Sequence, residues 1–167
     1  VAGLEAPKIG STSVAMGDID GDGDLDIYVT NYGATSVLRS GGKVSVRTVN
    51  GKQVVTGRYS NRIRIVKGSF VEIGEPDILY INDGNAKFTK VNWLDGNWLD
   101  ESGQPIKKEF WDLGLSVMIR DINQDGLPDI YNCNDFQTPD RLWINKGNGK
   151  FQLVNEMSIR HRSYFAM

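Results

Sequence analysis

One acidic block of residues occurs twice in this chain. Asp18 to Asn31 reads DIDGDGDLDIYVTN and Asp121 to Asn134 reads DINQDGLPDIYNCN, with 8 of 14 positions identical at an offset of 103. A second block, PDILYINDGNAKF from Pro76 to Phe88, recurs as PDRLWINKGNGKF from Pro139 to Phe151, with 9 of 13 positions identical at an offset of 63. Such self-similarity indicates a repeat architecture. Because the offsets differ by 40, the first copy carries an insertion of that length.

Each copy predicts four short strands, because β-branched and aromatic runs alternate with turn residues. The predicted strands are Ser13 to Ile19, Asp26 to Asn31, Ile78 to Asn82 and Lys87 to Val91 in the first copy, and Ser116 to Ile122, Asp129 to Asn134, Arg141 to Asn145 and Lys150 to Val154 in the second. The last two strands of each copy flank NDGN or NKGN, which suit a tight hairpin. Four antiparallel strands per unit are typical of a β-propeller blade. The sequence therefore predicts an all-β fold of propeller blades with acidic hairpin loops.

A third repeat is expected to begin near the end of the sequence. Ser163 to Met167 aligns with Thr12 to Met16, which gives an uninterrupted repeat of 48 residues. Closed propellers have about 4 to 8 blades, so we expect a fragment of a propeller, or a protomer that closes by assembly. The predicted units are a first repeat at 1–92 with an insertion at about 37–75, an aromatic inter-blade loop at 93–113, a second repeat at 114–158 and the start of a third at 159–167.

The acidic block of each copy fits the loop pattern DxDxDGxxD, with Asn in place of the second Asp in the second copy. Ca²⁺ takes about six to eight oxygen ligands, and alternate residues of a tight loop can direct their carboxylates at one centre. The glycine allows the bend that brings a backbone carbonyl and the last aspartate to the same point. The sequence therefore predicts two Ca²⁺ sites. The ligands are Asp18, Asp20, Asp22, Asp24 and Asp26 in the first and Asp121, Asn123, Asp125, Leu127 and Asp129 in the second, with Asp24 and Leu127 binding through their carbonyls.

The same opening pattern occurs in EF-hand loops, which end on a bidentate glutamate at loop position twelve. Val29 and Asn132 occupy that position here. The flanking residues alternate with a period of two, which is typical of strands and not of the helices of an EF-hand. The loops therefore connect strands. Mg²⁺ is less suited to them because it requires a stricter octahedron and retains its waters.

The two units, DIDGDGDLDIYVTNYG…LYINDGNAKF and DINQDGLPDIYNCNDF…LWINKGNGKF, resemble FG-GAP/VCBS-type repeats, whose blades also form the head of integrin alpha subunits. The resemblance covers most of the chain outside the insertion. It implies a calcium-stabilised propeller that is extracellular, periplasmic or displayed on the cell surface, and that serves adhesion or ligand binding. The FG-GAP segment itself is not present in clear form, so integrin ligand chemistry is not carried over.

The insertion is strongly basic. Its β-rich runs flank a hairpin signal at Asn50-Gly51, and Arg62 to Ile65 alternates polar and apolar side chains. With a net charge of −2 for the whole chain, its eight positive charges leave −10 on the remainder. These charges could bind a polyanion, or could keep exposed strand edges soluble. The basic residues are Arg39, Lys43, Arg47, Lys52, Arg58, Arg62, Arg64 and Lys67.

Three tryptophans, Trp93, Trp98 and Trp111, lie in the linker between the copies. They could stack on sugar rings or pack between the blades, and the second alternative is favoured. Cys133 and His161, the only cysteine and histidine, suggest no disulfide and no catalytic pair.

The sequence favours a binding or adhesion module with a protein or carbohydrate ligand over an enzyme. No specific nucleic-acid motif and no apolar stretch of transmembrane length is found. Two alternatives stay open. One is an accessory or catalytic propeller of a secreted polysaccharide-active enzyme, in which active-site residues come from several blades. The other is a self-assembling surface subunit, whose partners would be further blades of the same chain or neighbouring subunits.

Overall fold

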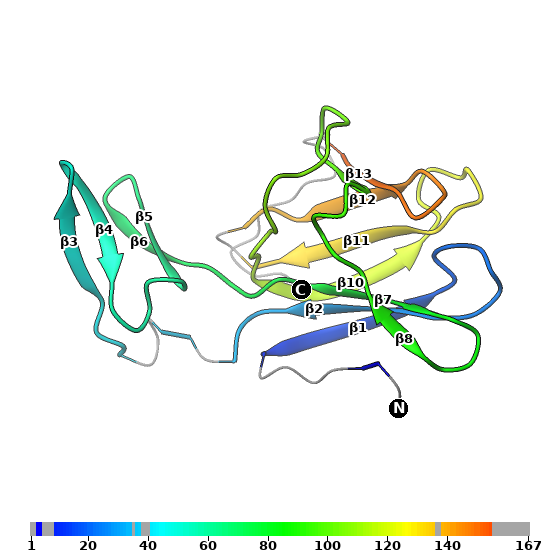
Figure 1. Cartoon of the computed structure of the whole chain (residues 1–167), viewed down its shortest axis with the longest axis horizontal. Helices are drawn as coiled ribbons and strands as arrows, with labels where there is room; N and C mark the ends of the chain where they lie inside the picture. Colours follow the sequence, from blue (N-terminus) through cyan, green and yellow to red (C-terminus); the bar gives the residue numbers. More distant parts are fainter. Residues whose placement is uncertain (1–2, 5–8, 35, 38–40, 136–137, 155–167) are drawn as a thin grey trace.

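A computed structural model describes residues 3–4, 9–34, 36–37, 41–135 and 138–154. The predicted start of a third repeat at 159–167, His161 and Arg39 lie outside these residues. The described chain is all-β: two sheets lie side by side, and two hairpins extend from one end of the pair (Figure 1). No helix capable of crossing a membrane occurs in the described part of the chain. The all-β prediction is confirmed, and the two larger sheets are blades of a β-propeller.

The first blade is a four-stranded antiparallel sheet with the order β1-β2-β7-β8. Its strands are β1 (Ser11–Gly17), β2 (Asp26–Asn31), β7 (Ile78–Asn82) and β8 (Phe88–Lys90). β1 ends two residues before the predicted boundary, because the N–H of Ile19 donates to the side chain of Asp26 rather than to a backbone carbonyl of β2. The insertion separates β2 from β7 in the chain, yet the two strands pair directly.

The second blade repeats this order and adds a fifth strand from the linker. Its order is β10-β11-β12-β13-β9, and β9 pairs in parallel with β13. The strands are β9 (Trp98–Leu99), β10 (Gly114–Arg120), β11 (Asp129–Asn134), β12 (Arg141–Asn145) and β13 (Phe151–Leu153). The linker was expected to be a loop, but burial of the Trp98 ring at 1% exposure brings its backbone to the open edge of the sheet.

A buried aspartate organises each blade at the start of its third strand. Oδ1 of Asp77 accepts a hydrogen bond from the Asn31 N–H at 2.8 Å, and its Oδ2 accepts one from the Tyr28 hydroxyl at 3.1 Å. In the second blade Asp140 accepts the equivalent bonds from Asn134 and Tyr131. Burial raises the pKa of Asp77 to about 7. The sequence repeat is thus also a repeat of hydrogen bonds.

The core lies between the blades and is rich in aromatic rings. The ring centres of Trp93 and Trp98 lie 4.0 Å apart. Trp98 also stacks on Phe151, with ring centres 4.8 Å apart, and meets Trp143 edge-on at 5.0 Å. The Trp93 indole N–H donates to the Asp77 carbonyl at 2.8 Å, which ties the linker to the first blade. Trp93 and Trp98 therefore pack in the core, as the favoured alternative predicted, and are inaccessible to a sugar.

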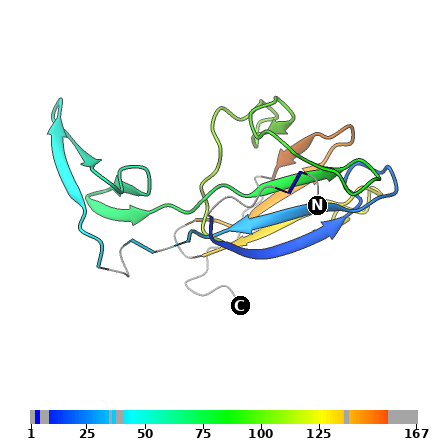
Figure 2. The ribbon, with the colours of Figure 1, turned by 60° about the horizontal axis from the view of Figure 1, so that its bottom comes forward.

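The insertion forms two hairpins that stand apart from both blades (Figure 2). They consist of β3 (Ser45–Val49) with β4 (Lys52–Thr56), and β5 (Ile63–Val66) with β6 (Ser69–Glu72). Asn50 and Gly51 have φ values of 49° and 74°, which the turn between β3 and β4 requires. All five residues of β3 are exposed, so the hairpin contributes no core to the blades.

Candidate metal centre

The first acidic loop, residues 18–26, joins β1 to β2 and brings three carboxylates together. One carboxylate oxygen from each of Asp18, Asp20 and Asp22 lies within 4.8 Å of the others. Asp18 is half-buried, and Asp20 and Asp22 are exposed. A cation that takes oxygen ligands at about 2.3–2.6 Å could contact all three. The structure therefore brings together three of the five predicted ligands of this loop.

Backbone hydrogen bonds to Asp18 close the loop. Its Oδ1 accepts from the N–H of Gly21 at 2.8 Å, and its Oδ2 accepts from the N–H of Gly23 at 3.1 Å. Gly21 and Gly23 have φ values of 81° and 96°, a region that glycine adopts at little cost. Further along, Oδ1 of Asp22 accepts from the N–H of Asp24 at 3.1 Å. The aspartates thus shape the loop and also crowd its negative charge.

Asp26, the last predicted ligand, is fully buried. Its Oδ2 accepts from the Ile19 N–H at 2.8 Å and its Oδ1 from the Asn82 N–H at 2.9 Å, so it joins the loop to β7. Burial raises its pKa, and these two hydrogen bonds oppose that shift. Sequence spacing did not indicate this anchoring role. Among the described residues each oxygen accepts one hydrogen bond, which leaves a lone pair that could bind a cation.

Asp24 was predicted to contribute its carbonyl, but its side chain also belongs to the acidic group. Its pKa is raised by desolvation and then by the charges of Asp22, Asp20, Asp18 and Asp83. Its Oδ1 is buried, with no hydrogen-bond partner among the described residues. The Asp24 carboxylate lies against the turn at Gly84, so Asp83 adds a carboxylate that the loop pattern missed.

The second acidic loop, residues 121–129, has nearly the same backbone hydrogen bonds. Oδ2 of Asp121 accepts from the Gly126 N–H at 2.9 Å, and Oδ1 of Asp125 accepts from the Leu127 N–H at 2.9 Å. Asp129 is fully buried and accepts from the N–H groups of Ile122 and Asn145, both at 2.9 Å. The two blades therefore present very similar loop geometries.

The second loop is less acidic than the first. Asn123 replaces one aspartate, and its amide donates to Oδ2 of Asp125 at 2.9 Å. Backbone and Asn123 hydrogen bonds lower the pKa of Asp125, and the charge of Lys146 lowers it further. Lys146 occupies the turn position that Asp83 holds in the first blade. The two loops thus share a shape and differ in electrostatic potential.

Comparison with known proteins bears on the first of these loops. Residues 11–46 match the FG-GAP repeat family. The match spans β1, the first acidic loop, β2 and the start of the insertion. No curated protein matches the chain. The FG-GAP part of the predicted resemblance is therefore confirmed, and such repeats form propellers.

The remaining candidate residues are placed as follows. Trp111 is half-buried at the junction between the linker and the insertion, where its carbonyl accepts a hydrogen bond from the Gly74 N–H at 3.2 Å. Cys133 is half-buried in β11, and burial raises the pKa of its thiol. A thiol with a raised pKa is a poor nucleophile at neutral pH. Neither position adds a catalytic group to the acidic loops.

Proposed function

We propose that the chain is a calcium-binding β-propeller module that serves binding or adhesion outside the cytoplasm, with a protein or carbohydrate as its ligand. The convergence of Asp18, Asp20 and Asp22 is the observation that carries the proposal. Its support grows because the second loop repeats the geometry, with Asp121, Asn123 and Asp125 at the equivalent positions. Oxygen-rich sites of this kind suit a hard cation.

The residues present fit Ca²⁺. The acidic group of the first loop includes the half-buried Asp24, whose pKa is raised and whose Oδ1 has no hydrogen-bond partner among the described residues, and such crowding of carboxylates is unfavourable without a positive charge. When bound, Ca²⁺ would neutralise these carboxylates and stabilise the folded loops. The anchors Asp26 and Asp129 would transmit that stabilisation to β7 and β12, since they already bond to Asn82 and Asn145.

The extracytoplasmic location is part of the same proposal. Loops of modest affinity, with dissociation constants of about 10⁻⁴ to 10⁻³ M, are filled mainly where calcium is abundant. Calcium bound in the loops would make the two blades more rigid in such an environment. A rigid scaffold with a projecting insertion suits a binding module, because protruding segments on stable scaffolds commonly carry recognition.

Calcium titration followed by thermal unfolding tests the proposal. A ligand at about 100 times its Kd stabilises a protein by about 2.7 kcal/mol, which for a chain of this size raises Tm by roughly 5–10 °C per site. We expect this rise in the wild type and its loss in the double variant Asp22→Ala, Asp125→Ala.

Asp95→Ala is the matched control, because Asp95 is an exposed aspartate whose Oδ1 accepts the N–H of Asn97, two residues on, at 2.8 Å. Asp22 and Asp125 make the same local hydrogen bond. The control should respond to calcium like the wild type. The same Tm shift in the double variant as in the wild type would refute the proposed sites.

A further inference from the structure

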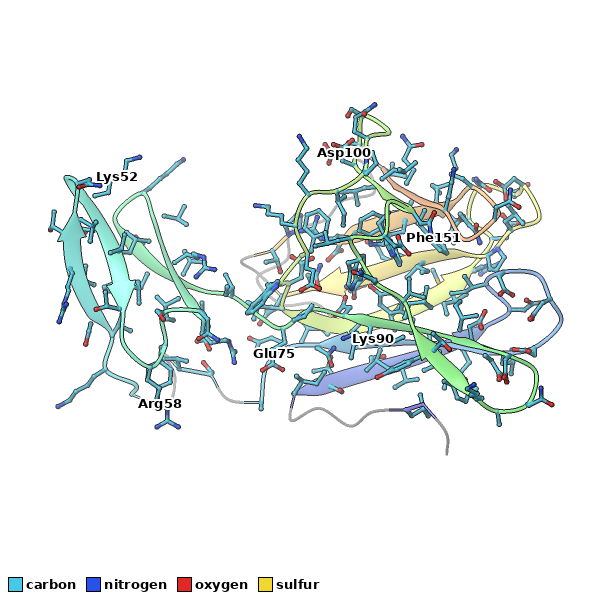
Figure 3. The ribbon with its side chains drawn as sticks, viewed as in Figure 1. Lys52, Arg58, Glu75, Lys90, Asp100 and Phe151 are labelled. Carbon is cyan, nitrogen blue, oxygen red and sulfur yellow. The ribbon has the colours of Figure 1, made fainter. Side chains whose placement is uncertain are left out.

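A cleft opens where the insertion meets the first blade. It has a volume of about 400 Å³, and it is lined by five segments, including Ile9 before β1 and Val37 after β2. The turn before β5 contributes Arg58, Tyr59 and Asn61, the segment after β6 contributes Glu75, and the linker contributes Trp111. Figure 3 shows Arg58 and Glu75 at this junction, away from Lys52 at the hairpin tip. The volume is within the range of small-molecule sites, about 300–1,000 Å³.

The charges of the cleft leave one guanidinium available. Arg62 is paired with Glu72 at 3.5 Å and with Glu75 at 3.3 Å. The other carboxylate oxygen of Glu75 accepts the N–H of Gly10 at 2.8 Å. Arg58 is exposed, and within the described ranges no carboxylate lies at ion-pair distance from it. The cleft therefore offers a free cation beside carboxylates that are already engaged.

The cleft also offers two aromatic side chains from separate segments. Tyr59 and Trp111 are both half-buried, unlike Trp93 and Trp98, which the core covers. The Arg58 guanidinium lies 5.6 Å from the centre of the Tyr59 ring, so charge and aromatic surface are adjacent. Partly exposed rings beside a few polar groups are typical of sites that bind a ligand with one apolar face.

We propose that this cleft binds an oligosaccharide containing uronic acid. Arg58 would pair with the sugar carboxylate, for which a planar guanidinium is well suited, and Tyr59 and Trp111 would contact the C–H faces of the sugar rings. The exposed amide of Asn61 would provide hydrogen bonds to hydroxyl groups. The inference rests on the proposed role as a binding module and names the ligand class. It also gives Trp111 a role that the buried tryptophans lack.

A longer, uniformly charged polymer suits the cleft less well. The chain outside residues 39–67 carries a net charge of −10, which disfavours the close approach of an extended polyanion. An acidic peptide would use Arg58 but has no ring face for both aromatic residues. A short acidic sugar uses the charge and the rings together.

Calorimetric titration with tetragalacturonate tests the inference on calcium-loaded protein. The wild type should bind, and Arg58→Gln should weaken binding by at least about tenfold, the expected loss of a charge-assisted hydrogen bond. Tyr59→Leu should weaken it as well, because leucine keeps the apolar packing and removes the ring. Arg47→Gln is the matched control: it removes the same charge from exposed β3, outside the cleft.

Two further titrations separate the possible sources of binding. The methyl ester of tetragalacturonate keeps the rings without the charge and should bind more weakly, and polyglutamate, which keeps only the charge, should not bind comparably. Equal binding of polyglutamate, or equal losses in Arg47→Gln and Arg58→Gln, would show a diffuse charge effect and overturn the inference. Absence of binding by a wild type whose Tm still responds to calcium would also overturn it, while leaving the proposed calcium sites intact.

Discussion

The acidic loops of the two blades have a very similar hydrogen-bonded shape but differ in electrostatic potential. In the first, the group of aspartates is extended by Asp83 from the neighbouring turn. In the second, Asn123 and Lys146 reduce the negative charge around Asp125. Both loops are nevertheless closed by backbone N–H groups that donate to their first aspartate. Loop shape and loop charge are therefore separable properties of this repeat.

This separation suggests that different loop positions determine the shape and the charge. Asp26 and Asp129 are buried and bonded to backbone N–H groups in both blades, so they maintain the shape. The exposed positions vary between the copies and set the charge. Replacing the anchor should therefore reduce stability to a similar extent in either blade. Replacing an exposed charged residue should change the calcium affinity of its own loop.

The largest expected effect follows from removing an anchor. Asp26→Ala or Asp129→Ala leaves two backbone N–H donors without an acceptor, each at a cost of about 1–3 kcal/mol. We expect each substitution to lower the free energy of unfolding by about 2–6 kcal/mol, to a similar extent in the two blades. Urea unfolding in excess EDTA measures this without any contribution from calcium. A loss below about 0.5 kcal/mol at either site would contradict the anchoring role.

The next effect concerns Asp77, which differs from its counterpart Asp140 by accepting a hydrogen bond from the other blade, through Asn132. Burial raises the pKa of Asp77 to about 7, so between about pH 4 and 7 the folded state holds this proton more tightly than the unfolded state. The associated stability is present at low pH and is lost as the pH rises through about 7.

Asp77→Asn should remove the pH-dependent part of the stability that comes from Asp77, which we expect to be roughly 1–3 kcal/mol. The measurement is the difference in unfolding free energy between wild type and variant across this pH range, in EDTA. As the pH rises, the wild type should lose stability relative to the variant. A difference that is constant with pH would show that Asp77 does not titrate in this window.

The repeat made the blades predictable from sequence, because both copies of the repeat had to fit the same arrangement of four strands. The hairpin at Asn50-Gly51 was equally clear, since its turn residues require positive φ. The inward anchoring of Asp26 was not, because a ligand pattern does not distinguish a carboxylate that faces solvent from one that bonds to β7. The pairing of β9 and the approach of Asp83 to Asp24 depend on contacts between distant segments, which have no periodicity in the sequence.

A smaller effect tests the difference in charge between the two acidic loops. Lys146→Asp should increase the calcium affinity of the second loop, and Asp83→Lys should decrease that of the first, each by about 1 kcal/mol or roughly fivefold, as expected for a nearby exposed charge. Calorimetric titration of each variant measures the change, and it should shrink in high salt. Lys150→Asp, which introduces the same charge at an exposed position of the second blade, is the control. Shifts of the same size in the control would assign the effect to net charge alone.

The smallest effect concerns backbone strain in the second loop. Gln124 has a φ of 63°, where the first blade has Gly21 at 81°. A side chain in this region costs about 1 kcal/mol, whereas glycine adopts it freely but loses more entropy on folding. Gln124→Gly should therefore stabilise the protein by a few tenths of a kcal/mol to about 1 kcal/mol, and Gly21→Ala should destabilise it by a similar amount. Thermal unfolding in EDTA measures both. If Gln124→Gly is instead destabilising, the Gln124 side chain supports the loop through contacts that outweigh its strained backbone, and the two loops differ in shape as well as in charge.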